Sequence, residues 1–559
     1  MANTRLAGAM RGPRLDRFDL LLLVVVAALS LWTLGLDLWQ VAVNGRVWTG
    51  TEAVYQEDGM QSLMWLRGIL QHGASPDLYV LAHTSADFFQ PLLAVSAGVA
   101  ALGVAPYVAL LLWKPVALLA IFFVTRAYVY RLIPGRWPRR AALTLALLYG
   151  WGQVIGDSWI VFWSWGYPFA LIALACTLGA LLAYSRARAA GRVSAAAALL
   201  GMLASWLHPW QGETLILIVV GAELALLARR RSAVTDSPAA IGGSAATDGR
   251  AATDGPTAAT GGQAASALPP AIRRPADLAA PALTVALTAL PLLYFALLVH
   301  FDPVWQRERE AALSTYPVGH VVSGFILLAL PALLAYRTRV SSFLELTARV
   351  WPAATVAIFA LSEWQGSGST HALLGVTIPL GVLAVQGVCT LPWPAVRARL
   401  RDGGRRSLPA LTVVAIAVVI VPGTLYMLKY AQRLVKPRSG NANFIAAGES
   451  RALAYLERDP HSGGVLTRFY LGMVVPAQTG RKVYTGNCYW SEPACRYRSV
   501  SAEKLLTGEM SATRARAFVR STGARYVLGD CESQNLTETL APMLAFVRHF
   551  GCAAVYVID

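Results

Sequence analysis

The stretch DLLLLVVVAALSLWTLGLDL, residues 19–38, decides the fold class of this chain. Its only charged residues are Asp19 and Asp37, at or next to its two ends. An apolar helix of about 20 residues is long enough to cross the ~30 Å hydrocarbon core of a lipid bilayer. The stretch therefore predicts a membrane-spanning helix near the N-terminus.

Ten further apolar stretches predict an α-helical polytopic membrane protein with about eleven transmembrane helices. The predicted spans are 19–38, 107–132, 140–156, 164–184, 194–210, 212–228, 279–299, 318–336, 349–364, 372–391 and 409–430. Of the 559 residues, 56% are hydrophobic and 14% are charged, and the mean hydropathy is +0.49. Soluble proteins are roughly 45–50% apolar and about 25% charged, so an ordinary soluble protein is excluded. The stretch 91–104 has only 14 residues, which favours a re-entrant or interfacial helix.

The net charge of +17 comes largely from loops on one side of the predicted membrane. Arginines gather at the N-terminus and in every second loop: Arg5, Arg11, Arg14, Arg17, Arg136, Arg139, Arg140, Arg186, Arg188, Arg192, Arg229, Arg230, Arg231, Arg337, Arg339, Arg397, Arg399, Arg401, Arg405 and Arg406. Lys and Arg are enriched in cytoplasmic loops. We therefore expect a cytoplasmic N-terminus, an extracytoplasmic C-terminal region and no role for nucleic acid. The first helix is expected to be a retained anchor and not a cleaved signal peptide.

The predicted organisation has two domains. Residues 1–430 form the transmembrane domain, in which 39–106 is the first extracytoplasmic loop with its juxtamembrane helices. Residues 232–276 are rich in Ala, Gly, Thr, Ser, Asp and Pro, which predicts a disordered cytoplasmic linker. Residues 436–559 alternate short apolar strands (GVLTR, KVYTG, RYVLG and AAVYVI) with helical patterns. That alternation indicates a small extracytoplasmic α/β domain.

Four of the six cysteines lie in this C-terminal region, at Cys488, Cys495, Cys531 and Cys552. An extracytoplasmic environment is oxidising, so we expect one or two disulfides, with Cys488–Cys495 and Cys531–Cys552 as the candidate pairs. A metal site is the alternative, but no histidine lies beside these cysteines at ligand spacing. Cys176 and Cys389 lie in apolar stretches and are expected to be packing residues.

Unusual polar residues gather in the loops on the extracytoplasmic side. The first loop holds the adjacent Glu57 and Asp58, and the full set adds Asp87, Asp157, His208, Trp210, Glu213, Arg307, Arg309 and His371. Charged groups at membrane boundaries are costly and are usually functional or paired. We therefore expect these side chains to line one cavity that opens to the outer leaflet.

Each signal also has a structural alternative. Glu57 and Asp58 precede an apolar helical pattern and can serve only as an N-terminal cap. The tryptophans after Asp157 can form an ordinary interfacial belt. His208 can cap a helix end, and the RERE segment 307–310 can lie on a solvated helix face. The sequence leaves these alternatives open.

The arrangement resembles the GT-C class of polytopic glycosyltransferases, which take a sugar from a polyprenyl-phosphate carrier on the non-cytoplasmic face. The resemblance rests on the cytoplasmic first helix, the long first loop with the pair Glu57–Asp58, the alternating spans and the outside C-terminal domain. The segment QPLL, 90–93, is similar to a Pro-containing juxtamembrane helix of protein O-mannosyltransferases and aminoarabinose transferases. The resemblance implies that an Asp of this acidic pair is the catalytic base. We therefore choose Asp58 as the base. Glu57 is the competing candidate, because several relatives have the order Asp-Glu where this chain has Glu-Asp.

The chemistry of such a transfer fits these residue types. The attacking hydroxyl must lose a proton to a base, and the departing phosphate needs its charge neutralised. Asp58 offers the base, and Arg307 and Arg309 offer bidentate contacts to phosphate. His208 and His371 are further candidates for contacts to phosphate or acceptor. Attack assisted by a single carboxylate implies inversion at the anomeric centre. Glu57, Asp58, Asp87 and Asp157 can share a divalent cation only if they converge, and we assign no metal or other cofactor.

We therefore expect a glycosyltransferase of a bacterial plasma membrane. It would move a hexosyl or pentosyl group from a polyprenyl-phosphate sugar to a cell-envelope glycan, lipid or protein acceptor. The alternatives are a polymerase or ligase of lipid-linked polysaccharide, a transporter or flippase of lipid-linked sugars, and a scaffold that binds cell-wall glycan. Transporters often have internal repeats and polar residues near the bilayer midplane, and this sequence has neither pattern.

Overall fold

A computed structural model describes residues 15–52, 54, 56–152, 155–235, 275–311, 316–340, 342–365, 368–391, 402–435 and 440–559. Most of the predicted linker, 236–274, lies outside the described residues. The predicted domain boundaries at 430 and 436 stay predictions, because α19 continues to Val435 and 436–439 are not described.

Each of the eleven predicted spans overlaps a helix or, for 107–132, two consecutive helices. In chain order these are α2 (Arg17–Asn44), α5 with α6 (Pro106–Leu111 and Trp113–Leu132), α7 (Arg136–Leu148), α10 (Pro168–Ala189), α11 (Ala195–Leu207), α12 (Pro209–Thr235), α13 (Pro275–Phe301), α15 (Val318–Ala335), α16 (Phe343–Gln365), α17 (Thr377–Cys389) and α19 (Asp402–Val435). Eight of these segments are long and apolar enough to cross a membrane. The protein is a multipass membrane protein, as predicted.

Three of the helices are shorter than the spans predicted for them. α7, α11 and α17 have 13 residues each. Such a helix is about 20 Å long, which is less than the ~30 Å hydrocarbon core. The predicted span 140–156 is wrong beyond Leu148, because the chain leaves the helix at Tyr149 and turns through Gly152 at φ +68°. These helices pack against other helices of the bundle, so their apolar residues are explained by burial inside the protein.

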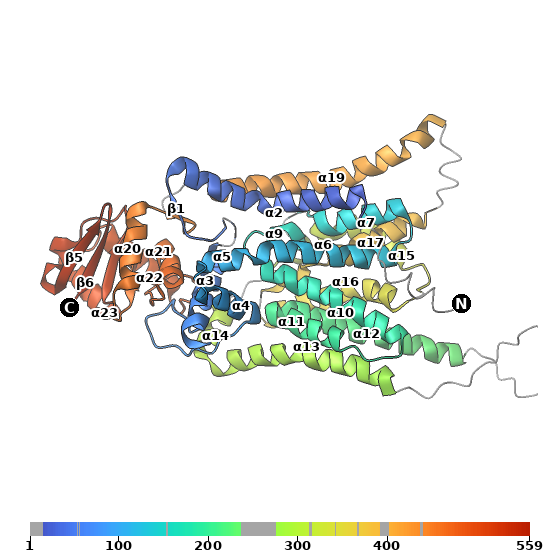
Figure 1. Ribbon diagram of the computed structural model, residues 1–559, viewed down its shortest axis with the longest axis horizontal. Coiled ribbons are helices and arrows are strands. Elements are labelled where there is room, and N and C mark those ends of the chain that lie inside the picture. The colour runs from blue at the N-terminus through green and yellow to red at the C-terminus, as the bar shows by residue number, and fades with distance from the viewer. Residues whose placement is uncertain are drawn as a thin grey trace, which may run out of the picture.

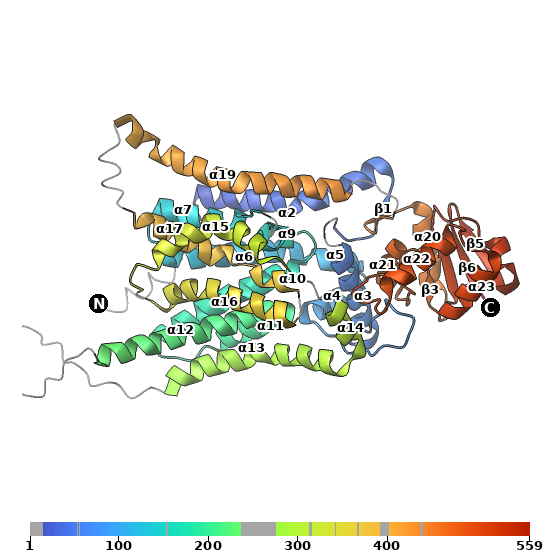
Figure 2. The same ribbon diagram turned by 180° about the vertical axis from the view of Figure 1, so that it is seen from behind.

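The two ends of the bundle differ in what they carry. The start of α2 and the ends of α12 and α13 that flank the linker lie at one end of the long axis (Figure 1). At the other end lie three short helices, α3 (Gln56–His72), α4 (Pro91–Ala101) and α14 (Pro303–Ala311), next to the C-terminal domain. The view from behind shows the same arrangement (Figure 2). The start of α2 and the C-terminal domain are therefore at opposite ends of the membrane helices.

The C-terminal domain contains a four-stranded sheet in the order β3-β4-β6-β5. The strands are β3 (Val465–Leu466), β4 (Tyr526–Gly529), β5 (Leu544–Phe550) and β6 (Ala553–Ile558), and only the β3–β4 pair is parallel. The helices are α20 (Ala447–Arg458), α21 (Phe469–Thr479), α22 (Cys495–Leu506), α23 (Ala512–Thr522) and the one-turn α24 (Thr537–Leu540). The predicted small α/β unit is therefore present.

Two details of this domain differ from the sequence prediction. The segment KVYTG forms only an isolated bridge, in which Val483 pairs with Val465. Strand β5 was not predicted, because its apolar residues LAFV, 544–547, are followed by Arg548 and His549 and all of its side chains are partly or fully exposed. Both expected disulfides, Cys488–Cys495 and Cys531–Cys552, are present.

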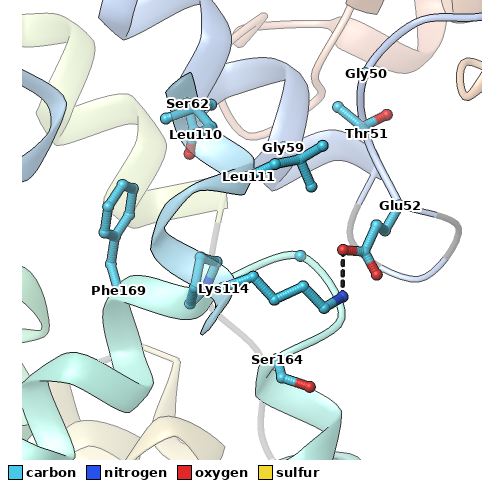
Figure 3. Close-up of a pocket in the computed structure, with 12 residues that line it drawn as sticks. Gly50, Thr51, Glu52, Gly59, Ser62, Leu110, Leu111, Lys114, Ser164 and Phe169 are labelled. Carbon is cyan, nitrogen blue, oxygen red and sulfur yellow. Dashed lines mark hydrogen bonds and ion pairs between the residues drawn. The ribbon is translucent and has the colours of Figure 1, made fainter. Parts of the chain in front are cut away.

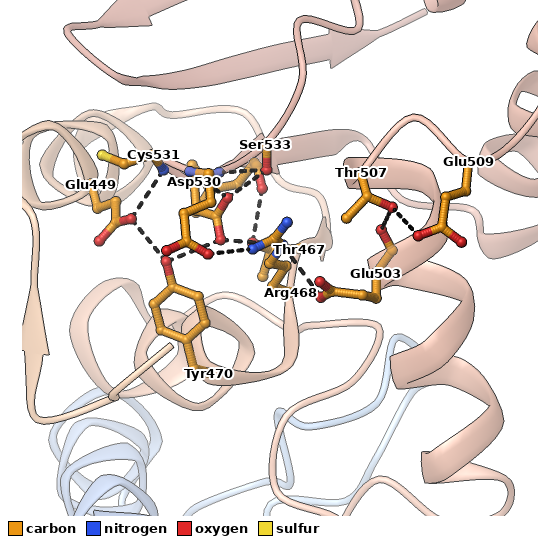
Figure 4. Close-up of polar contacts among 12 residues, drawn as sticks. Glu449, Thr467, Arg468, Tyr470, Glu503, Thr507, Glu509, Asp530, Cys531 and Ser533 are labelled. Atoms are coloured by element: carbon orange, nitrogen blue, oxygen red, sulfur yellow. Dashed lines mark hydrogen bonds and ion pairs between the residues drawn. The ribbon is translucent and has the colours of Figure 1, made fainter. Parts of the chain in front are cut away.

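A buried arginine links several segments of the domain. Arg468 is 8% exposed and lies directly before α21. Its guanidinium forms ion pairs with Glu532 at 3.0 Å, Glu503 at 3.3 Å and Asp530 at 3.4 Å (Figure 4). Asp530 is 1% exposed, so Arg468 provides the opposite charge that its burial requires.

The C-terminal domain packs directly on the segment between α2 and α5. Strand β1 (Val47–Trp48) pairs antiparallel with β2 (Phe444–Ile445), which joins residues almost 400 positions apart. The backbone amide of Val483 donates to the carbonyl of Leu78 at 2.9 Å, and Arg67 of α3 forms an ion pair with Glu457 of α20 at 2.8 Å. Buried apolar residues of α3 share one cluster with residues of α21: Met60, Leu63, Met64, Leu471 and Met473. The loop that carries Glu57 and Asp58 is therefore held between the bundle and the C-terminal domain.

Candidate active site

Glu57 and Asp58 lie in the first turn of α3, where acidic residues interact favourably with the helix dipole. Both side chains are partly buried. Protein atoms enclose Asp58, and this burial, together with the charge of Glu57, raises the pKa of Asp58 to about 6. Burial also raises the pKa of Glu57. Asp58 is thus surrounded by protein atoms but still partly exposed, with a carboxyl group that ionises at about pH 6, and we call the surroundings of Glu57 and Asp58 the acidic recess.

A third carboxyl group, which the sequence analysis missed, lies near this pair. Glu308 of α14 is partly buried, and burial together with the charge of Asp58 raises its pKa to about 7. The phenol of Tyr79 also has a raised pKa, because it is buried and near the charges of Asp77, Glu57 and Asp58. Glu308 belongs to the RERE segment, where alternating charges resemble a solvated helix face, so its sequence context hides it.

His208 and His371 form a pair deep in the same end of the bundle. Nε2 of His208 lies 3.1 Å from Nδ1 of His371, and the two rings stack. Trp210 stacks on His371 with ring centroids 4.5 Å apart, and Trp163 meets both histidines edge-on. Burial lowers the pKa of His371 to about 4, so His371 is neutral at physiological pH. Three of the predicted site residues are thus brought together. Tyr167 links them to the acidic recess, since its ring lies 6.3 Å from that of His208 and within reach of the charge of Asp58.

Asp157 lies beside the histidine pair in the one-turn helix α8 (Ile155–Ser158). Its carboxylate accepts a hydrogen bond from the hydroxyl of Thr370, the residue before His371. Burial raises the pKa of Asp157 to about 6. Its backbone carbonyl accepts a hydrogen bond from Nε1 of Trp163 at 3.0 Å. Asp157 therefore lies next to Trp163 and the segment that carries His371.

Asp87 and Arg307 belong to a neighbouring cluster around the start of α14. Burial and the nearby carboxyl of Asp302 raise the pKa of Asp87 to about 6. Asp77 is buried as well, and its pKa rises to about 7 although the charges of Arg307 and Lys482 partly oppose the rise. Arg307 is partly buried and its electrostatic partner is Asp77. The sequence analysis missed Asp77 and Asp302, because single aspartates in loops are common.

The remaining two predicted residues are Arg309 and Glu213. Arg309 is exposed, and its guanidinium donates to the carbonyl of Gln365 at 3.1 Å, which joins α14 to the end of α16. Glu213 is partly buried on α12, one turn after Trp210. The predicted residues thus share one end of the bundle but divide into neighbouring clusters.

A buried lysine lines a pocket beside the acidic pair. Lys114 of α6 is 4% exposed, and its ammonium bonds to the carboxylate of Glu52 at 2.5 Å (Figure 3). Glu52 also accepts a hydrogen bond from Thr33 of α2. The pocket wall includes Gly59, which directly follows Asp58, and Phe169 at the start of α10. Lys114 is a single charged residue in an apolar stretch. This sequence feature could have identified it as a candidate site residue.

Among the described residues, no group of three or more His, Cys, Asp or Glu side chains lies close enough to hold a metal ion. The sequence analysis assigns no metal ion to the protein, and this stays a prediction.

Comparison with solved structures identifies the fold. The oligosaccharyltransferase of Archaeoglobus fulgidus in its apo form aligns with a TM-score of 0.53 and 15% identity, over 92% of this chain and 70% of that one. The AglB oligosaccharyltransferase of Archaeoglobus fulgidus, in complex with an inhibitory peptide and a dolichol-phosphate, aligns with a TM-score of 0.52 and 14% identity, over 97% and 74%. ArnT of Cupriavidus metallidurans bound to undecaprenyl phosphate aligns with a TM-score of 0.49, which is too low to carry an argument. No protein-family model and no curated protein sequence matches the chain.

The chain therefore has the fold of the GT-C glycosyltransferases, and the predicted resemblance is confirmed at the level of fold. At these identities the activity, the substrates and the residue roles do not follow from the likeness.

Proposed function

We propose that this protein is a membrane glycosyltransferase. It transfers a sugar from a polyprenyl-phosphate donor to an acceptor hydroxyl at the end of the bundle where the C-terminal domain lies. The observation that carries the proposal is the recess around Asp58, an enclosed and reachable carboxyl with a pKa of about 6 on a GT-C fold. A base in this range is ionised at neutral pH and still accepts a proton in the transition state.

In this mechanism the acceptor oxygen attacks the anomeric carbon of the donor sugar. Asp58 takes the hydroxyl proton, a new glycosidic bond forms, and the bond to the phosphate oxygen breaks. The phosphate leaves with the electron pair on the polyprenyl carrier, and the anomeric centre inverts. The leaving group needs no proton, so one carboxylate and a source of positive charge are sufficient.

Two cations are available for the donor phosphate. Arg307 is partly buried near Asp77, and Lys114 lies on the wall of the pocket that includes Gly59. Arg309 is exposed and already bonds to a backbone carbonyl, which makes it the weaker candidate. The AglB neighbour was solved with a dolichol-phosphate, which supports a lipid phosphate as the donor class.

The histidine pair has a different role in this proposal. His371 is neutral at physiological pH, so it cannot neutralise a phosphate. His208, His371, Trp163 and Trp210 form a wall of flat rings behind the acidic recess. Trp163 and His208 are buried, so we assign the partly exposed Trp210 and His371 of this wall to the sugar or the first prenyl units of the donor, which present apolar surface.

The membrane orientation follows from the same proposal. The N-terminus would be cytoplasmic, and the recess and the C-terminal domain would face the outside of a bacterial plasma membrane. The arginine pattern of the loops supports this orientation.

The test is sugar transfer by the purified full-length protein. Radiolabelled polyprenyl-phosphate mannose, glucose and arabinose serve as donors, and a cell-envelope extract serves as the source of acceptor. We expect transfer by the wild type and a loss of at least ~10²-fold in Asp58→Asn, the size expected for removal of a general base. Glu57→Gln is the matched control, because it removes the neighbouring carboxylate and keeps Asp58. A loss confined to Glu57→Gln would move the base to Glu57, and no transfer by wild type from any donor would contradict the proposal.

A further inference from the structure

The C-terminal domain sends a short closed loop toward the acidic recess. We call residues 487–495 the disulfide loop, because the Cys488–Cys495 disulfide closes it. Oδ1 of Asn487 accepts a hydrogen bond from the backbone amide of Tyr489 at 3.1 Å, and the carbonyl of Asn487 accepts one from the amide of Ser491 at 2.8 Å. These bonds and the disulfide reduce the conformational freedom of the loop.

The disulfide loop is also fixed to the first extracytoplasmic loop. The hydroxyl of Ser491 donates to the carbonyl of Tyr79 at 3.0 Å and accepts from the backbone amide of Gly486 at 3.0 Å. Tyr79 is within range of the charges of Glu57 and Asp58. The position of the disulfide loop relative to the acidic pair is therefore set by direct contacts.

Trp490 anchors the loop between the two helices that carry the carboxyl groups. It is 6% exposed, and its ring meets Trp65 of α3 edge-on at 5.7 Å and Trp305 of α14 edge-on at 4.8 Å. α3 carries Glu57 and Asp58, and α14 carries Glu308. Edge-to-face pairs of this kind add to the stabilisation from burial.

Tyr489 differs from its neighbour, because 47% of its surface is exposed. It lies close enough to Glu57, Asp58 and Glu308 for their charges to raise the pKa of its phenol, after burial as the larger cause. An exposed aromatic ring on a rigid loop beside three carboxyl groups has no evident packing role. It presents a flat apolar face and a hydroxyl group to whatever enters the recess.

We propose that Tyr489 binds the acceptor and that the acceptor is a carbohydrate, an inference that rests on the proposed transferase function. A sugar ring has one face of C–H groups and an edge of hydroxyls. The face stacks on the Tyr489 ring, while carboxyl groups of the recess accept hydrogen bonds from the hydroxyls and one hydroxyl is directed at Asp58. Negative charge in the recess disfavours an anionic acceptor, and a sugar supplies the several donors that these oxygens require.

The test measures saccharide binding without transfer. The purified full-length protein, without donor, is titrated with maltose, cellobiose, mannobiose and arabinobiose, and binding is followed by saturation-transfer NMR. The variants are Tyr489→Ala and Tyr489→Phe, with Tyr497→Ala as the control, because Tyr497 is 69% exposed on α22 just after the loop. We expect wild type to bind at least one saccharide and Tyr489→Ala to bind it about tenfold more weakly, the size of one aromatic contact. Tyr489→Phe should retain most of the binding, and Tyr497→Ala should match the wild type.

Transfer kinetics separate this inference from the proposed function. With the bound saccharide as acceptor, Tyr489→Ala should raise the acceptor KM about tenfold and leave the donor KM unchanged. Equal losses in Tyr489→Ala and Tyr497→Ala, a change confined to the donor KM, or no binding of any saccharide by wild type would overturn the inference. Transfer to the cell-envelope extract by wild type would leave the proposed function intact in each of those cases.

Discussion

At the scale of single residues, ionisation decides what the site can do. Asp58 and Glu57 are neighbours on α3, yet burial raises the pKa of Asp58 to about 6 and the charge of Glu57 contributes to that value. The folded protein therefore favours the protonated form of Asp58. Protonated Asp58 therefore stabilises the folded state relative to the unfolded state. This stabilisation is fully present below the usual pKa of aspartate and is lost as the pH rises through about 6.

The first prediction is a pH profile for sugar transfer. Because the base must be ionised, the rate of the wild type should rise between about pH 5 and pH 7 with a midpoint near 6. Glu57→Gln removes the negative charge that raises the pKa of Asp58, so its midpoint should move to lower pH. Initial rates in a constant-ionic-strength buffer series check both values. A midpoint that stays in place in Glu57→Gln would show that the two carboxyl groups are not coupled.

The second prediction concerns stability. Asp58→Asn removes a carboxylate whose ionised form the fold disfavours, so its thermal midpoint should exceed that of the wild type at pH 8. The difference should vanish at pH 4, where Asp58 of the wild type holds its proton. Thermal unfolding in detergent at the two pH values measures the effect. A midpoint below that of the wild type at pH 8 would contradict the raised pKa.

The third prediction tests Lys114 as a cation for the donor phosphate. Lys114→Met alone leaves the buried Glu52 without its partner, which typically costs ~3–5 kcal/mol. The double variant Lys114→Met with Glu52→Gln removes both charges and should fold with a thermal midpoint near that of the wild type. We expect this variant to raise the donor KM at least about tenfold, the cost of roughly one charge-assisted contact. Glu52→Gln alone keeps the lysine but leaves it buried without its partner, so its donor KM serves as the control once its thermal midpoint shows that the variant folds. An unchanged donor KM in the double variant would assign the ion pair to structure alone.

Sequence patterns identify some of these residues and miss others for physical reasons. Adjacent acids such as Glu57 and Asp58 stand out because they precede an apolar helix. Glu308 does not stand out, because alternating charges normally indicate solvent contact and only the approach of α14 to α3 buries it. The function of Tyr489 depends on a contact between segments about 430 residues apart, and no local pattern encodes such a distance.

At the scale of elements, hydropathy predicts where helices lie better than how long they are. Hydropathy predicts membrane spans at α7, α11 and α17, because helix faces that pack against protein and helix faces that meet lipid are both apolar. The end of α7 at Leu148 follows from packing, since the turn after it lies against other helices: a Cβ on Gly152 would come within 3.2 Å of Gly324 of α15. In the C-terminal domain, α22 and β5 escaped prediction because their surfaces are mixed.

The fourth prediction belongs to the elements of the C-terminal domain. Arg468→Met leaves Asp530 buried without its opposite charge, and we expect a loss of ~3–5 kcal/mol in the free energy of unfolding. Denaturant titration and limited proteolysis of the full-length protein measure the loss. Arg514→Met on α23 is the control, because Arg514 is exposed and its loss should change stability by less than ~0.5 kcal/mol. Equal stability of the two variants would show that the ion pairs around Arg468 contribute nothing.

At the scale of the whole molecule, the two ends of the bundle carry different chemistry. The start of α2 and the ends of α12 and α13 that flank the linker lie at one end, and the acidic recess, the histidine pair and the C-terminal domain lie at the other (Figure 1). The C-terminal domain contacts the segments around the recess through the β1–β2 pairing, the bond from Ser491 to Tyr79 and the ring contact of Trp490 with Trp65 of α3. A glycan acceptor held by that domain would thus meet a lipid-borne donor at the bundle end. This separation is consistent with a transferase that works on one face of the membrane.

The fifth prediction is the orientation of the molecule, tested by cysteine labelling in intact bacterial cells. Cys389 is exposed and would react, so Cys389→Ser provides the background. In that background Ser511→Cys, at an exposed site before α23, should react with a membrane-impermeant maleimide, and Ser237→Cys in the predicted linker should react only after the cells are opened. The arginine-rich loops require this result, because positive charge is retained on the cytoplasmic side. The reverse labelling pattern would place the acidic recess in the cytoplasm, and a carrier-linked sugar would then have to be available there.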